Sequence, residues 1–249
     1  MMQIKSSLSK AEINMERRNQ KIKQIVQRIK NNKIQKIDQK YGNGPDLYFY
    51  KKLIHSRGDS RNIESFLSDD RNLEILYATL VAWGMNSRRA KMKYFDQFKE
   101  SILSCKKEIK SLESFWANGN VDKAEMKSCL RETYEKLHIM KTKAKLVSNS
   151  KLLHFLFPEK LMPMDGGHTL HYFYGNASES VKSVKKYLEI IEVSFEIMSI
   201  PENWQKYLSG DWNITVPKMI DNAIILFVQE QSNRFAAETC DSHQLLSVC

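Results

Sequence analysis

The chain is 249 residues long, with 42% hydrophobic residues, 27% charged residues and a formal net charge of +10 at pH 7. These fractions are ordinary for a folded globular protein, and no apolar run reaches the roughly 18 residues that a membrane-spanning helix needs. The first residues also lack the pattern of a secretion signal, so we expect a cytoplasmic protein with no membrane association.

The sequence predicts neither a metal site nor a cofactor. Zinc and iron–sulfur sites need clustered cysteines, whereas the cysteines here are far apart, so we expect reduced thiols. Asp165, His168 and His171 form a D-x-x-H-x-x-H pattern, but on a helix they would spread over more than half a turn and could not all face one ion without irregular backbone. The cysteines are Cys105, Cys129, Cys240 and Cys249.

Basic residues are concentrated in residues 1–44, which also contain apolar residues at helical spacing. This pattern predicts a basic helix with a narrow apolar stripe, either a solvated surface helix or an arm that binds nucleic acid. A membrane-surface helix fits less well, because the stripe lacks Trp, Phe and Leu. The stripe is Ile22, Ile25, Val26 and Ile29, and the basic residues are Lys5, Lys10, Arg17, Arg18, Lys21, Lys23, Arg28, Lys30, Lys33, Lys36 and Lys40, against Glu12, Glu16 and Asp38.

Tyr41–Pro45 (YGNGP) breaks the helical pattern and predicts a linker, which separates a basic helical arm over 1–44 from a compact helical domain over 45–249. Asp69 or Asp70 can cap a helix that ends near Trp83-Gly84. Asn86 can cap a second helix over about 87–104, with basic residues in its first turns.

Helical periodicity continues to the end of the domain, so we predict an all-α fold. A helix over about 123–138 is followed by a lysine-rich connector over 139–145, and a helix over 146–157 is terminated by Pro158. Further helices are expected directly after Asp165, over about 177–198, and over 216–228 with Pro217 in the first turn.

Three segments, in this order, resemble the helix-hairpin-helix DNA glycosylases, which excise damaged or modified bases. Leu76–Ala90 (LYATLVAWGMNSRRA) is similar to the family's early helix–loop–helix, Ile139–Lys145 stands at the hairpin position, and Pro163-Met-Asp165 matches the Pro-x-Asp segment. The match covers about 70–175. It departs from the family in having Lys141 and Lys143 where the hairpin glycines would stand, and in lacking the iron–sulfur cysteines.

The resemblance implies a two-lobed helical bundle, with a glycosylase-like lobe at about 70–175 and a second lobe from 45–69 plus 176–249. It also implies roles for individual residues. Asp165 takes the place of the catalytic aspartate, and Lys145, twenty residues upstream, that of the catalytic lysine. DNA contacts are expected from Asn86, Ser87, Arg88, Arg89, Lys141, Lys143 and Lys151, and a base pocket from Trp83, Asn149, His168 and Tyr172.

The chemistry explains why one carboxylate would matter at this point. Cleavage of an N-glycosidic bond builds positive charge on the sugar, which a fixed anion stabilises. Asp165 can do this while water attacks, or can assist Lys145 if the amine forms a Schiff base, which would add AP-lyase activity. Pro-x-Asp-Gly is also an ordinary turn-and-cap sequence.

We therefore expect a monomeric hydrolase that acts on double-stranded DNA with a damaged or modified base, associated with the nucleoid in a bacterial or archaeal cell. It would serve in repair or in defence against modified phage DNA. The alternative is a non-catalytic helical module that binds DNA or RNA through its basic arm.

Overall fold

The computed structural model describes residues 10–31, 33–87, 91–117, 122–177 and 183–245, and the all-α prediction is confirmed for them. Within these ranges the helices are joined by loops, and extended backbone pairs only at two isolated bridges. The helices are α1 (Lys10–Lys30), α2 (Lys36–Tyr41), α3 (Pro45–Asp59), α4 (Ile63–Leu67), α5 (Asp70–Leu80), α6 (Phe95–Leu103), α7 (Lys106–Ala117), α8 (Lys123–Lys136), α9 (Leu146–Leu156), α10 (His171–Tyr174), α11 (Ser183–Met198) and α12 (Val216–Leu245).

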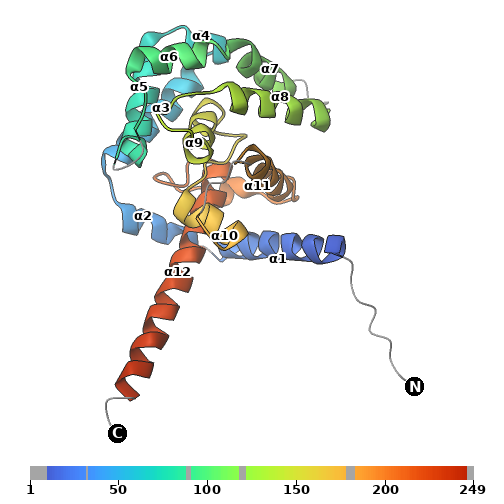
Figure 1. The fold of residues 1–249 in the computed structure, drawn as a ribbon, viewed down its shortest axis with the longest axis vertical. Helices are drawn as coiled ribbons and strands as arrows, with labels where there is room; N and C mark the ends of the chain where they lie inside the picture. The colour runs from blue at the N-terminus through green and yellow to red at the C-terminus, as the bar shows by residue number, and fades with distance from the viewer. Residues whose placement is uncertain (1–9, 32, 88–90, 118–121, 178–182, 246–249) are drawn as a thin grey trace, which may run out of the picture.

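Helix α9 lies at the centre of the molecule (Figure 1), and every one of its residues except Val147 is buried. Helices α4 to α8 gather at one end, while α1, α10 and α12 lie at the other, where α12 projects beyond the body. Helix α3 packs mainly against α5, and α4 against α7. Residues 45–69 thus pack mainly against α5 and α7, which belong to the predicted lobe over 70–175. This differs from the prediction, which groups them with residues 176–249.

The basic N-terminal helix is packed onto the body. Its apolar stripe packs against α11 and α12, with Ile25 at 2% and Ile29 at 0% exposure and with Ile22 and Val26 partly buried. Some of its cations pair with acids: Arg18 Nη2 lies 2.5 Å from Glu196 Oε1, and Lys30 Nζ lies 2.6 Å from Glu202 Oε2. Because burial of the stripe stabilises the fold, the described part of 1–44 belongs to the helical body and does not stand apart as an arm.

The helix predicted between Asp69 and Trp83 is confirmed as α5. The helix predicted over about 87–104 corresponds to α6, but its predicted start is wrong. Asp69 caps α5 by accepting a hydrogen bond from Arg71 N at 2.9 Å, and Gly84 turns the chain with a φ of +82°. Only glycine adopts that angle readily. The next helix begins at Phe95, not near residue 87, because Lys91–Lys93 pairs with Ile139–Lys141 through two backbone hydrogen bonds.

The remaining helices start near their predicted positions. Asp122 caps α8, and α9 covers Leu146–Leu156, as the position of Pro158 indicated. Helix α11 begins at Ser183, and residues 178–182 of the predicted helix lie outside the described part of the chain. Helix α12 begins at Val216 and runs past the predicted end to Leu245. Among the described residues, no helix is both long and apolar enough to span a membrane.

Candidate functional site

A cavity of about 390 Å³ lies where α2, α3, α9 and α12 meet the turn after α5 and the segment before α10. Its rim includes partly exposed side chains, Asp165 at 39% and His168 at 28% exposure. Its floor is formed by buried polar groups. We call it the central cavity, and it is lined by Ile37, Tyr41, Asp46, Ala82, Trp83, Gly84, Lys151, Pro163, Met164, Asp165, His168, Trp212, Lys218, Asp221, Asn222 and Ile225.

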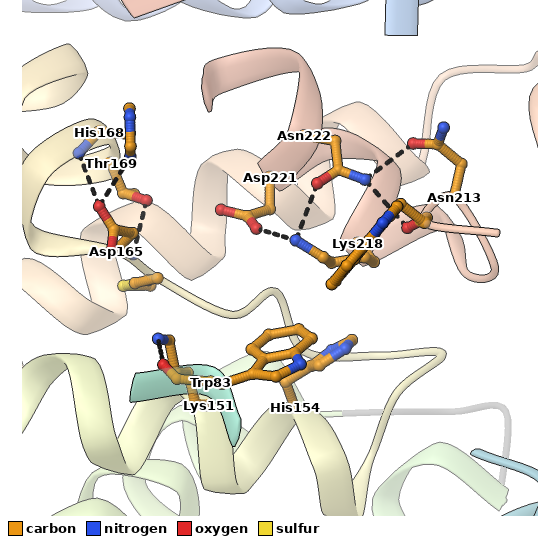
Figure 2. A network of polar contacts seen from close by, with 12 residues as sticks. Trp83, Lys151, His154, Asp165, His168, Thr169, Asn213, Lys218, Asp221 and Asn222 are labelled. Carbon is orange, nitrogen blue, oxygen red and sulfur yellow. Dashed lines mark hydrogen bonds and ion pairs between the residues drawn. The ribbon is translucent and has the colours of Figure 1, made fainter. Parts of the chain in front are cut away.

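Asp165 caps a π-helical turn, Gly166–Leu170, at the rim of the central cavity. Its Oδ1 accepts a hydrogen bond from His168 N at 3.0 Å and lies 2.8 Å from His168 Nδ1 (Figure 2). Gly167 leaves room for the carboxylate in this position, since a Cβ at residue 167 would lie 3.3 Å from the same oxygen, which is a tight contact. Burial acts to raise the pKa of Asp165, but the His168 hydrogen bond and the Lys151 charge outweigh it and lower the pKa to about 2. The carboxylate is therefore ionised at neutral pH.

Lys151 reaches the central cavity from α9, and its side chain is buried. Its Nζ donates a hydrogen bond to the Trp83 carbonyl oxygen at 2.9 Å. Burial lowers the pKa of Lys151 to about 8, with the charges of Asp165 and Asp221 acting in the opposite direction. At pH 7 about one-tenth of this amine is thus neutral and nucleophilic.

Trp83 and Trp212 supply an aromatic wall of the central cavity, with ring centroids 6.2 Å apart. The indole N–H of Trp83 donates to the Asp46 carbonyl oxygen at 3.2 Å, and that of Trp212 to the Gly42 carbonyl oxygen at 3.1 Å. These bonds fix both rings, so the wall is formed before any ligand arrives.

The first turns of α12 bring a buried polar cluster to the floor of the central cavity (Figure 2). Lys218 Nζ lies 2.7 Å from Asp221 Oδ2 and 2.8 Å from Asn222 Oδ1. Burial raises the pKa of Asp221, and the Lys218 charge opposes this. The sequence analysis missed these residues, although one signal was present: in the otherwise apolar first part of α12, over 216–228, three polar residues stand at i, i+3 and i+4, which places them on one helical face.

Four of the predicted site residues meet in the central cavity: Asp165, Trp83, His168 and Lys151. Lys145 lies elsewhere, at the start of α9. Its Nζ donates to the Glu135 carbonyl oxygen at 2.6 Å and lies 3.2 Å from His138 Nε2. The predicted pairing of Lys145 with Asp165 is therefore not seen, because Lys145 comes before the first turn of α9 whereas Lys151 lies farther along it.

Tyr172 and Asn149 were expected to line a base pocket, but they do not line the central cavity, and their side chains connect helices instead. The Tyr172 hydroxyl donates to the Lys21 carbonyl oxygen at 2.9 Å and so ties α10 to α1. Asn149 is 1% exposed, and its Nδ2 donates to the carbonyl oxygens of Tyr134 at 2.9 Å and Leu137 at 3.1 Å. It joins α9 to the end of α8.

Replacement of Asn149 by alanine is expected to lower the free energy of unfolding by about 2 kcal/mol, because two carbonyl oxygens lose their donor in a buried setting. Chemical denaturation of the two proteins measures this. Asn86→Ala, at an exposed position, is the matched control and should change stability by less than about 0.5 kcal/mol. Equal effects of the two substitutions would contradict the buried role of Asn149.

Of the residues expected to contact DNA, Asn86, Ser87, Lys141 and Lys143 are exposed, whereas Lys151 is buried and lines the central cavity, so its predicted place on the surface is wrong. Asn86 and Ser87 follow the Gly84 turn and are exposed, while Arg88 and Arg89 lie outside the described residues. Lys141 and Lys143 are exposed on the 139–145 connector, and Lys141 Nζ lies 3.8 Å from the centroid of the Tyr94 ring.

Comparisons of the chain with protein-family models, with curated proteins and with solved structures find no match. Among the described residues, no group of three or more His, Cys, Asp or Glu side chains could hold a metal ion.

Proposed function

We propose that the protein hydrolyses the N-glycosidic bond of a damaged or modified base in DNA, with Asp165 as the stabilising carboxylate. The observation that carries this proposal is an ionised carboxylate at the rim of a cavity that has an aromatic wall. An enzyme acting on a base within a duplex flips it into such a pocket. The base then enters the central cavity while the sugar stays at its rim, beside Asp165.

The position of Asp165 suits the charge that develops in this reaction. As the bond to the base breaks, positive charge grows on the sugar, and a carboxylate stabilises it without needing to move a proton. The pKa of about 2 keeps the anion available at neutral pH. The Asp165 backbone also donates to Thr169 Oγ1 at 2.9 Å, so the capping turn holds the carboxylate in place.

If an amine attacks the sugar, Lys151 is better placed than Lys145, because it lines the same cavity as Asp165. Borohydride traps the imine that such an attack forms. Any covalent adduct between protein and DNA is expected to persist in Lys145→Met and to disappear in Lys151→Met. With the pKa of Lys151 at about 8, adduct formation should rise with pH, with a midpoint near pH 8, and level off about one pH unit above it, because the neutral amine is the nucleophile.

An adduct that is lost in Lys145→Met and kept in Lys151→Met would contradict this assignment. A wild-type enzyme that releases base without any adduct would assign the attack to water, and Asp165 would keep its role.

The proposal is tested directly by incubating the full chain with DNA duplexes that each carry one modified base, followed by mass spectrometry of the released material. A free base from at least one substrate is the expected result. DNA binding without release from any substrate would favour a non-catalytic module that binds nucleic acid.

A further inference from the structure

Asp221 has a carboxylate oxygen that the protein leaves without a partner. Its Oδ2 lies 2.7 Å from Lys218 Nζ, whereas Oδ1 is buried and has no hydrogen-bond partner among the described residues. The side chain is 5% exposed and lines the central cavity. In Figure 2 the free oxygen points away from Lys218, to the side on which Asp165 lies. Because a buried unpaired acceptor is costly, this oxygen is ready to accept a donor from a ligand.

The charges around the central cavity favour a neutral ligand. Three carboxylates, Asp46, Asp165 and Asp221, line the cavity with two amines, Lys151 and Lys218, so the lining has no large excess of either sign. A phosphate would meet these carboxylates in the same cavity, which is unfavourable. The wall of Trp83 and Trp212 adds a preference for a flat ring.

Lys218, which binds the other oxygen of Asp221, supplies a hydrogen-bond donor close to the free acceptor Oδ1. The Lys218 ammonium carries three N–H groups. Two of them are used by Asp221 Oδ2 and Asn222 Oδ1, and the third has no hydrogen-bond partner among the described residues. The ammonium also lies at the aromatic wall, with Nζ 5.0 Å from the centroid of the Trp83 ring and 5.8 Å from that of the Trp212 ring. An acceptor next to a donor is complementary to an N–H next to a carbonyl group. A ring lactam offers this pair, because its ring N–H donates a hydrogen bond and the adjacent carbonyl oxygen accepts one.

We infer that Asp221 is a specificity-determining residue that selects bases with a ring lactam, as in hypoxanthine, guanine and uracil types. Asp221 Oδ1 accepts the ring N–H, and Lys218 donates to the adjacent carbonyl oxygen. Adenine and cytosine types have no ring N–H in their common forms. This inference rests on the proposed base excision and names its substrate class.

Methylation of the ring nitrogen tests the inference in the wild-type chain. Duplexes carry either hypoxanthine or 1-methylhypoxanthine, and either uracil or 3-methyluracil, and base release is measured by mass spectrometry. We expect release from a lactam base and a loss of about 100-fold or more on methylation, since a site built to bind an N–H rejects an analogue without it. Equal release from the members of each pair would overturn the inference while leaving base excision in place.

A protein variant provides the second arm. Asp221→Asn removes the charge that strengthens the hydrogen bond, so release of the lactam base should fall by about 10- to 100-fold. Asp59→Asn is the matched control and should keep the wild-type rate, because its exposed side chain, 3.2 Å from His55 Nε2, lies outside the central cavity. An unchanged rate in Asp221→Asn would also overturn the inference.

A binding measurement keeps the two proposals distinguishable. If no duplex releases a base, the proposed base excision is wrong. The inference is then decided by the binding of inosine and of 1-methylinosine to the full chain, measured by the change in tryptophan fluorescence. Quenching by inosine alone would support Asp221 as a reader of the lactam. Equal quenching by both nucleosides, or quenching by neither, would overturn it.

Discussion

Asp165→Asn is expected to lower the rate of base release by about 100- to 1000-fold while leaving the affinity for DNA nearly unchanged. The amide has the shape of the carboxylate but carries no charge to stabilise the sugar cation, and loss of one such electrostatic group costs about this much. Base release is measured in single-turnover assays and DNA affinity by titration. Release as fast as that of the wild type would remove Asp165 from catalysis.

The fold should survive this change. Asn is about as good a helix N-cap as Asp, and its oxygen can still accept the hydrogen bond that His168 N donates at 3.0 Å. Asp122→Asn is a matched control, because Asp122 also caps a helix, accepting from Ala124 N at 2.8 Å, and does not line the central cavity. It should keep full activity. A similar loss in both variants would point to a general effect of removing a cap.

Lys218→Met is expected to lower the free energy of unfolding by about 3 to 5 kcal/mol at pH 7, since it leaves the buried Asp221 carboxylate without its cation. Both side chains are 5% exposed, so water cannot replace the lost partner. The loss should shrink as the pH falls. Burial raises the folded-state pKa of Asp221 above its unfolded value, and the variant gains stability once the folded carboxyl is protonated.

The matched control is Lys51→Met, which breaks an ion pair with Asp211 whose side chains are 43% and 45% exposed. Exposed pairs contribute little, so this change should stay below about 1 kcal/mol. Urea denaturation at pH 7 and pH 5 measures both variants. If Lys218→Met were no more destabilising than Lys51→Met, the Lys218–Asp221 pair would not be the buried link that its geometry indicates.

The sequence alone predicted where several helices lie, among them α5, α8 and α9, because helix positions depend on residues close together in the chain. Asp69 and Asp165 cap the turns that follow them, as their positions indicated. In contrast, Asn86 does not begin a helix, and the cap Asp122 was not predicted. Periodicity also identified the apolar stripe of α1. What covers that stripe was not predictable, since α11 and α12 follow more than 150 residues later.

Only the tertiary structure decided which polar groups share the central cavity. Spacing along the chain favoured Lys145 as the partner of Asp165, but the packing of α9 brings Lys151 to the cavity and directs Lys145 to the end of α8. Asp221 comes from a distant helix, and its free oxygen depends on how α12 meets the Trp83 turn. Local sequence determines where helices begin and end, whereas long-range burial determines which of their side chains meet.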